Sequence, residues 1–141
     1  MTAREYFGQA YKLDERIQSQ LEEVSALREM ATGLSSPSYG EKVQSSAVGD
    51  ASYVKTVEKM ILLENKINDE IDTLVALKEQ IYETIAKVSD RRERLVLRCR
   101  YIEGCSWRSI AAKLDRDVNT AYYWHKRALE HVVLPENPIV V

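Results

Sequence analysis

The feature that most constrains this chain is an apolar stripe over residues 52–88, a stretch without glycine or proline. Its apolar residues recur at alternating steps of three and four, the period of one face of an α-helix. A helix of about 35 residues would be roughly 50 Å long. Because one amphipathic helix is not stable alone in water, the stripe requires a partner helix. The stripe consists of Val57, Met60, Ile67, Ile71, Leu74, Ile81, Ile85 and Val88.

A second amphipathic segment, residues 2–31, offers that partner. Thr2 and Glu5 are spaced as a helix-starting capping box, and Gly33 is a typical helix end. Residues 32–52 are rich in serine and lack a pattern, so we expect a flexible surface loop there. The segment's apolar face consists of Tyr6, Ala10, Leu13, Ile17, Val24, Leu27 and Ala31.

The sequence therefore predicts a long, coiled-coil-like antiparallel hairpin over residues 1–88, closed by the 32–52 loop. An intermolecular coiled coil remains an alternative, and it would make the hairpin an oligomerisation region. The stripe can equally be ordinary core that needs no partner protein.

Composition and charge narrow the class of protein further. Only 5 glycines and 3 prolines occur among 141 residues, which favours an all-α fold over a β-sandwich. No apolar run is long enough for a membrane span and no signal core is present, so a cytoplasmic protein is expected. Residues 1–88 hold 10 basic and 15 acidic residues, whereas residues 89–131 hold 10 basic and 6 acidic. The basic segment is the candidate for a polyanionic partner.

Residues 89–132 are typical of a three-helix, helix-turn-helix domain. Ser89 or Asp90 begins a helix that ends at Glu103-Gly104, and Ser106 begins a short helix through Leu114. Residues 115–117 form a tight turn, and Asp117 is placed to cap a last helix, residues 118–132. Two short helices joined by about three residues form the DNA-binding unit.

One face of the last helix has the residue types that contact DNA. Asn and Lys can bind base edges or phosphates, and tyrosine offers flat apolar surface for thymine methyl groups. On the preceding helix and turn, basic residues are expected to face the DNA backbone. The predicted DNA-binding residues are Arg108, Lys113, Arg116, Val118, Asn119, Thr120, Tyr122, Tyr123, Lys126 and Arg127.

The order Arg-Glu-Arg-x-Val-Leu-Arg-x-Arg-Tyr-x-x-Gly-x-Ser-Trp-x-x-Ile-Ala-x-x-Leu, residues 92–114, resembles region 4 of sigma-70-type factors. Asn119-Thr120 and the run from Lys126 to Leu129 resemble its recognition helix. Three positions depart from the family pattern: Asp115 replaces a usual glycine, and Arg116 and His125 replace apolar residues. The resemblance implies a helix-turn-helix fold and leaves promoter specificity open.

The first 88 residues do not resemble other sigma regions, so no complete sigma factor is expected. A helical front with a sigma-like tail is similar to phage and prophage late-gene activators of the ArpU and RinA type, as are Trp107 and the run from Tyr122 to His125. This resemblance implies a transcriptional regulator, expected to bind double-stranded DNA as a dimer formed by its front helices. The alternatives are an RNA polymerase-binding adaptor without DNA readout and a small-terminase-like DNA-packaging subunit.

No enzyme signature emerges, and no cofactor or metal is expected. Cys99 and Cys105 are spaced C-x5-C, and His125 and His131 are spaced H-x5-H, neither of which matches a zinc-finger pattern. Reduced thiols are favoured over a disulfide. His125, Trp107 and Trp124 are expected to pack in the domain rather than contact bases. The apolar tail, residues 133–141, is expected to pack on the body or on a partner.

Overall fold

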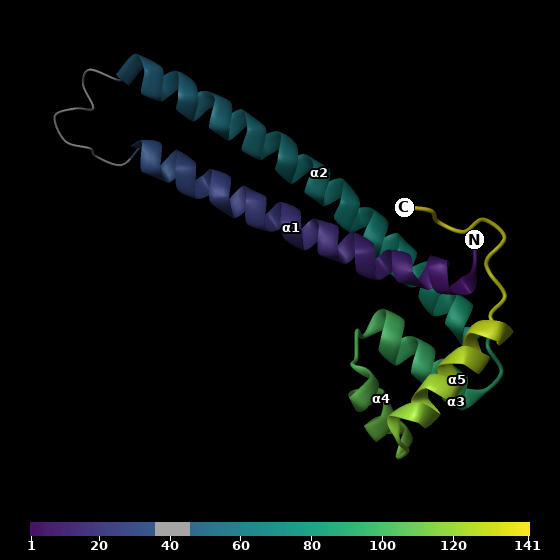
Figure 1. The fold of residues 1–141 in the computed structure, drawn as a ribbon. Coiled ribbons are helices and arrows are strands. Elements are labelled where there is room, and N and C mark those ends of the chain that lie inside the picture. Colours follow the sequence, from purple (N-terminus) through teal and green to yellow (C-terminus); the bar gives the residue numbers. More distant parts are fainter. Residues whose placement is uncertain (36–45) are drawn as a thin grey trace. The chain divides into compact units, whose positions relative to one another are not determined.

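The computed structural model describes residues 1–35 and 46–141, and every regular element among them is helical (Figure 1). Two long helices come first, α1 (Ala3–Ser35) and α2 (Ser46–Ala86). The short α3 (Arg91–Leu97) continues directly into the π-helix η2 (Arg98–Ile102), and α4 (Trp107–Leu114) and α5 (Val118–His131) follow. The expected all-α class, with a long helix pair before a helical domain, is confirmed.

Both ends of the interval expected to be a loop are helical. The helices extend into it from both sides, to Ser35 and from Ser46, and the remainder of the 32–52 interval lies outside the described residues. Serine and glycine usually indicate loops, but each residue added to an existing helix gains a hydrogen bond at little further entropic cost. The Thr56 hydroxyl, for example, donates to the Ser52 carbonyl at 2.9 Å.

The chain divides into two compact units. Residues 15–72 form one, named here the stem, and residues 1–14 with 73–141 form the other, named the helix-turn-helix unit. The sequence predicts a single boundary near residue 88. In the structure, the start of α1 and the end of α2 instead belong to the same unit as the C-terminal helices. Each unit has its own buried residues.

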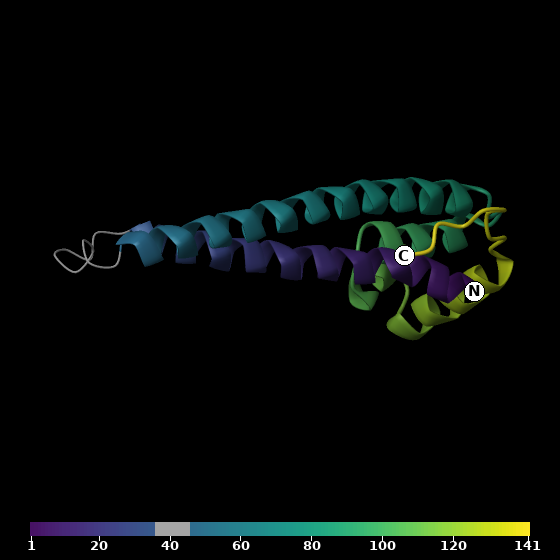
Figure 2. The ribbon, with the colours of Figure 1, turned by 90° about the horizontal axis from the view of Figure 1, so that it is seen from above.

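In the stem, α1 and α2 run antiparallel (Figure 2). Arg16 pairs with Glu70 at 3.2 Å and Arg28 with Glu64 at 3.3 Å, so the pairing advances along one helix while it retreats along the other. The predicted face of α1 is buried at Ile17, Val24, Leu27 and Ala31, and α2 contributes Ile67.

The helix-turn-helix unit is held by a core between α3, η2, α4 and α5. Its buried centre consists of Val96, Cys99, Ile110, Ala111 and Ala121. Leu95, Trp107, Leu114, Val118 and Trp124 pack around that centre. Because α4 contributes Ala111 at its contact with the neighbouring helices, the short helices can approach closely.

The start of α1 is an integral part of this unit. Tyr6 and Phe7 are fully buried, and the Phe7 ring stacks on Tyr101 of η2 with centroids 5.0 Å apart. The C-terminal tail closes over the same region. Gln9 donates to the Ile139 carbonyl at 2.9 Å, and Gln80 accepts from the Ile139 amide at 2.9 Å. The tail therefore packs on the body of the chain.

Candidate nucleic-acid interface

Three side-chain caps set the bounds of the short helices. Asp90 accepts hydrogen bonds from the amides of Arg92 and Glu93, Ser106 from that of Ser109, and Asp117 from that of Thr120. Each cap satisfies an amide that a helix start leaves without a partner. The Thr120 side chain and amide hold the pKa of Asp117 below its usual value, so the cap stays ionised at neutral pH. All three predicted helix starts are confirmed.

The turn between α4 and α5 relies on a left-handed residue. Asp115 has φ 55° and ψ 44°, and its amide donates to the Ala112 carbonyl at 3.1 Å, while the Arg116 amide donates to the Ala111 carbonyl at 3.0 Å. Aspartate tolerates this conformation better than most residues, which explains how it replaces glycine. The turn thus satisfies the last carbonyls of α4 and lets α5 begin at once.

Helix α5 divides into an inner and an outer face. Ala121, His125 and Ala128 are buried at steps of four and three. Tyr122 and Tyr123 are 47% and 53% exposed, and Asn119 and Lys126 are also exposed. The outer face therefore presents two phenols, a carboxamide and an ammonium group to solvent.

One expected member of the outer face lies elsewhere. Val118 is half-buried and packs against the core cluster, because it stands one helical turn before the buried Ala121. Thr120 is also half-buried, and its amide is held by Asp117. Val118 and Thr120 both stand in the first turn of α5, a position typical of DNA contacts. In the structure, however, their contacts are with the core and with the helix cap.

The basic residues around the motif differ in their partners. Arg108 on α4 is exposed, and Arg116 is exposed at the turn, where it donates to the Asp115 carbonyl at 3.1 Å. Lys113 contacts Glu103 at 3.1 Å, which raises the pKa of Lys113 and lowers that of Glu103. Arg127 donates to the Tyr123 hydroxyl at 3.1 Å. Arg108 and Arg116 are therefore the more available cations.

Aromatic rings connect the outer face of α5 to the interior. Trp107, the first residue of α4, contacts Tyr122 and His125 edge-on, each at a centroid distance of 4.8 Å. The His125 imidazole shares a 2.7 Å hydrogen bond with the Tyr101 hydroxyl. Both tryptophans are half-buried and pack against the core, as expected. Sequence reasoning missed Tyr101, because the contact joins residues 24 positions apart in the chain.

A buried carboxylate ties α3 to the end of α5. Glu93, only 1% exposed, accepts from His131 Nδ1 at 2.8 Å and lies 3.8 Å from the Arg127 guanidinium. A buried charge needs partners of this kind. Arg127, which the sequence pattern places on the DNA face, is about half exposed and contacts both Glu93 and the Tyr123 hydroxyl.

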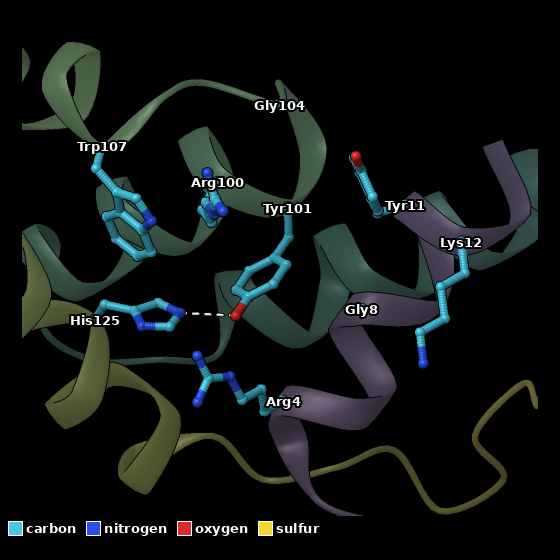
Figure 3. Close-up of a pocket in the computed structure, with 9 residues that line it drawn as sticks. All are labelled: Arg4, Gly8, Tyr11, Lys12, Arg100, Tyr101, Gly104, Trp107 and His125. Carbon is cyan, nitrogen blue, oxygen red and sulfur yellow. Dashed lines mark hydrogen bonds between the residues drawn. The ribbon is translucent and has the colours of Figure 1, made fainter. Parts of the chain in front are cut away.

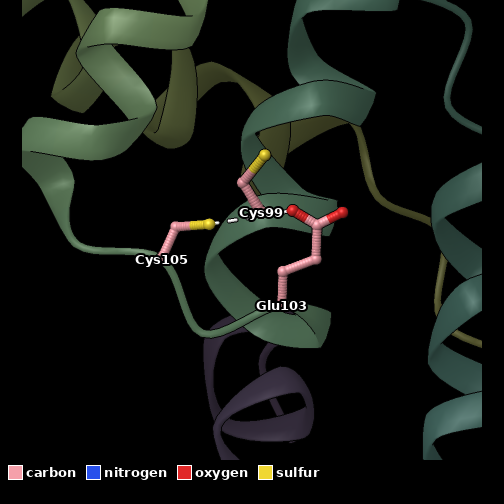
Figure 4. Close-up of side chains that lie close together, drawn as sticks. All are labelled: Cys99, Glu103 and Cys105. Carbon is pink, nitrogen blue, oxygen red and sulfur yellow. Dashed lines mark hydrogen bonds between the residues drawn. The ribbon is translucent and has the colours of Figure 1, made fainter.

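The two cysteines lie together with Glu103 (Figure 4). Their sulfur atoms and a Glu103 oxygen all lie within 4.8 Å of one another, which is a set of ligand types that zinc accepts. The Lys113 ammonium already contacts all three, at 3.8 Å from Cys99 Sγ, 3.7 Å from Cys105 Sγ and 3.1 Å from Glu103. Neither histidine takes part, and both cysteines are free thiols, with the pKa of Cys99 raised mainly by burial.

Within the described part of the chain, no helix has the length and apolarity to cross a membrane.

No curated protein and no solved structure matches the chain. A family model does match: residues 78–132 match the family described as sigma-70, region 4. The match covers the last turns of α2 and the whole of α3, η2, α4 and α5. Residues 78–132 therefore form a sigma-70 region 4-like helix-turn-helix domain.

Proposed function

We propose that the protein is a sequence-specific DNA-binding regulator of transcription, with α5 as the recognition helix in the major groove. The observation that carries this proposal is the outer face of α5. Asn119, Tyr122 and Lys126 project from the exposed side of a capped helix in the segment that matches sigma region 4. The major groove of B-DNA is wide enough to admit an α-helix such as α5.

Each outer side chain has a distinct chemical role in this proposal. The Asn119 carboxamide can donate to and accept from one adenine edge, and the Lys126 ammonium can donate to a guanine edge or a phosphate. Tyr122 and Tyr123 supply flat apolar surface for thymine methyl groups and hydroxyls for phosphates. Arg108 and the capped start of α4 face the phosphate backbone, because a helix N-terminus attracts anions.

The remaining residues of the predicted set take supporting roles. Val118 and Thr120 position the first turn of α5 through the core contact and the Asp117 cap. Lys113, Arg116 and Arg127 add positive charge near the motif, although Lys113 and Arg127 also contact Glu103 and Glu93. Their contribution is electrostatic, so it should weaken with salt.

The regulator would act on late genes of a phage or mobile element, as the ArpU and RinA resemblance implies. Two copies joined through their front helices would contact two half-sites about 34 Å apart or at a larger spacing. The exposed apolar side chains of α2, among them Ile61 and Leu62 at 49% and 70% exposure, support such self-association. Its natural setting would be the host cytoplasm.

The deciding experiment measures DNA binding to the upstream regions of the protein's own genome over a salt series. The variant is Tyr122→Ala/Lys126→Ala, and the matched control is Tyr82→Ala/Lys87→Ala, an exposed pair in the same unit. We expect sequence-selective wild-type binding, a loss of at least about 1–3 kcal/mol in the α5 variant and no loss in the control.

Weak binding that ignores both sequence and the α5 substitutions would contradict the proposal. RNA polymerase captured without any DNA shift would then favour the adaptor function. Rings of many subunits in light scattering would favour a packaging subunit.

A further inference from the structure

A pocket beside the start of α4 has no role in the function proposed above. It is a cavity of about 440 Å³ within the helix-turn-helix unit, formed by the first turns of α1, η2, the Gly104 bend, Trp107 and His125 (Figure 3). Tyr101 and Trp107 form aromatic walls, and the buried His125 forms part of the floor. The α1 side lies outside the segment that matches sigma region 4.

The pocket carries concentrated positive charge. Arg4 and Lys12 from α1 and Arg100 from η2 all line it, and none of its nine lining residues is acidic. Among the described residues, no carboxylate lies within ion-pair distance of these three cations. Three cations without a counter-charge repel one another, so an anion between them would be stabilised.

His125 adds no charge of its own to the pocket at neutral pH, so the positive charge there comes from the arginine and lysine side chains. Burial, and then the charges of Arg4 and Arg100, lower the pKa of His125 to about 4. The imidazole is therefore neutral at pH 7 and shares its hydrogen bond with Tyr101. The charges of both guanidinium groups act on His125, and Figure 3 shows Arg4 of α1 and Arg100 of η2 on either side of the Tyr101–His125 hydrogen bond.

Arg100 is already positioned. Its guanidinium stacks over the Trp107 ring at 4.6 Å and donates to the Cys105 carbonyl at 3.2 Å. Guanidinium groups bind phosphate through paired N–H donors, and a fixed guanidinium loses little entropy when it does so. Arg4 and Lys12 are exposed long side chains that can close on the same anion.

We propose that this pocket binds a phosphate group, held by Arg4, Lys12 and Arg100. The source that the geometry favours is a phosphodiester of the bound DNA, because the pocket adjoins the N-terminus of α4, whose proposed place is across the DNA backbone. Trp107 separates the pocket from Tyr122 on the outer face of α5. The first helix of the chain would then extend the DNA interface beyond the helix-turn-helix motif. The choice of DNA as the source rests on the proposed function, whereas the phosphate site itself does not.

The test compares Arg4→Gln/Lys12→Gln with a control of equal charge change, Lys55→Gln/Lys59→Gln, on the exposed surface of α2 in the stem. Both are exposed pairs, and circular dichroism with thermal melting verifies that each variant folds. The first measurement is the slope of log K against log salt for a cognate duplex. Removing one phosphate contact should make this slope less steep by about 0.9. We expect a change of about 1 for the pocket variant, since one phosphate contact is lost, and none for the control.

The second measurement uses inorganic pyrophosphate without DNA, followed by the NMR signals of the Trp107 indole and the Arg100 guanidinium. Saturable shifts that vanish in the pocket variant support a phosphate site even if no DNA binds, a result that would sink only the proposed function. Such shifts with an unchanged salt slope would assign the site to a free phosphorylated molecule. An unchanged slope together with no pyrophosphate shifts would overturn the proposal.

Discussion

The helix-turn-helix unit and the stem are built from similar helices but are stabilised in different ways. In the helix-turn-helix unit, the buried polar groups have specific partners: Glu93 contacts His131, and His125 contacts Tyr101. In the stem, Gln20 Oε1 and Glu70 Oε2 are buried without a hydrogen-bond partner among the described residues. The ion pairs that join α1 and α2 in the stem involve partly exposed side chains.

This difference teaches which part of the chain tolerates change. Buried polar pairs fix one arrangement, since any other leaves a desolvated group without a partner. An apolar stripe with surface ion pairs is less restrictive, because neighbouring registers bury similar area and exposed pairs contribute about 0–1 kcal/mol. The helix-turn-helix unit is thus the more narrowly specified of the two.

The largest effect that tests this comparison is a core truncation in each unit. Ile110→Ala removes a fully buried side chain of α4 and should lower the free energy of unfolding by about 2–5 kcal/mol. Leu27→Ala in the stem should cost less, about 2 kcal/mol, because a two-helix seam can collapse around the gap. Urea unfolding followed by Trp107 and Trp124 fluorescence and by circular dichroism measures both. If both substitutions lower the free energy of unfolding by the same amount, the two units are equally sensitive to the loss of a core side chain and the comparison fails.

The second test titrates His125. Its pKa is lowered to about 4, first by burial and then by Arg4 and Arg100, whereas the unfolded imidazole titrates near 6.5. Between these values the unfolded state binds the extra proton, so stability falls as the pH drops from 6.5 to 4, by up to about 3 kcal/mol. Unfolding of wild type and His125→Gln across that window isolates this contribution. His131→Gln is the control, and a wild-type slope that survives in His125→Gln would contradict the assignment.

The smallest effect contrasts a helix cap with a surface ion pair. Asp117→Ala removes the acceptor for the Thr120 amide and should cost about 1 kcal/mol, whereas Asp117→Asn should retain most of the stability. Glu64→Gln in the stem, which breaks the exposed contact with Arg28, should cost less than about 0.5 kcal/mol. Thermal melting at two salt concentrations separates them. If Glu64→Gln costs as much as Asp117→Ala, the stem depends on specific contacts too.

Local rules predict much of this fold from the sequence. The capping residues Ser106 and Asp117 and the left-handed Asp115 are all recognisable from their own neighbours in the chain. Every residue predicted for the apolar face of α1 is buried, because the period of a helix is visible in one short window. Such features need no knowledge of distant residues.

Features that depend on distant residues escape this kind of reasoning. Phe7 falls outside the predicted stripe, yet it is fully buried against Tyr101, 94 positions later, because α1 packs on η2. Val118 is predicted to lie on the DNA face, yet it packs against the core, because position in the first turn does not reveal where the neighbouring helices lie. The pocket residues Arg4 and Lys12 give no signal for the same reason, since only the fold brings them to Arg100.

The contacts of the C-terminal tail have a consequence for the order of events during synthesis. Gln9 bonds to Ile139 and Val141, across 130 and 132 positions of chain. The helix-turn-helix unit combines residues 1–14 with 73–141, whereas every residue of the stem falls between 15 and 72. On the ribosome, the two helices of the stem can therefore pair before residues 73–141, which contact the first turns of α1, have been synthesised. Closure of residues 139–141 over α1 is a non-local step that follows synthesis of the stem, which makes the folding rate of the helix-turn-helix unit sensitive to these contacts.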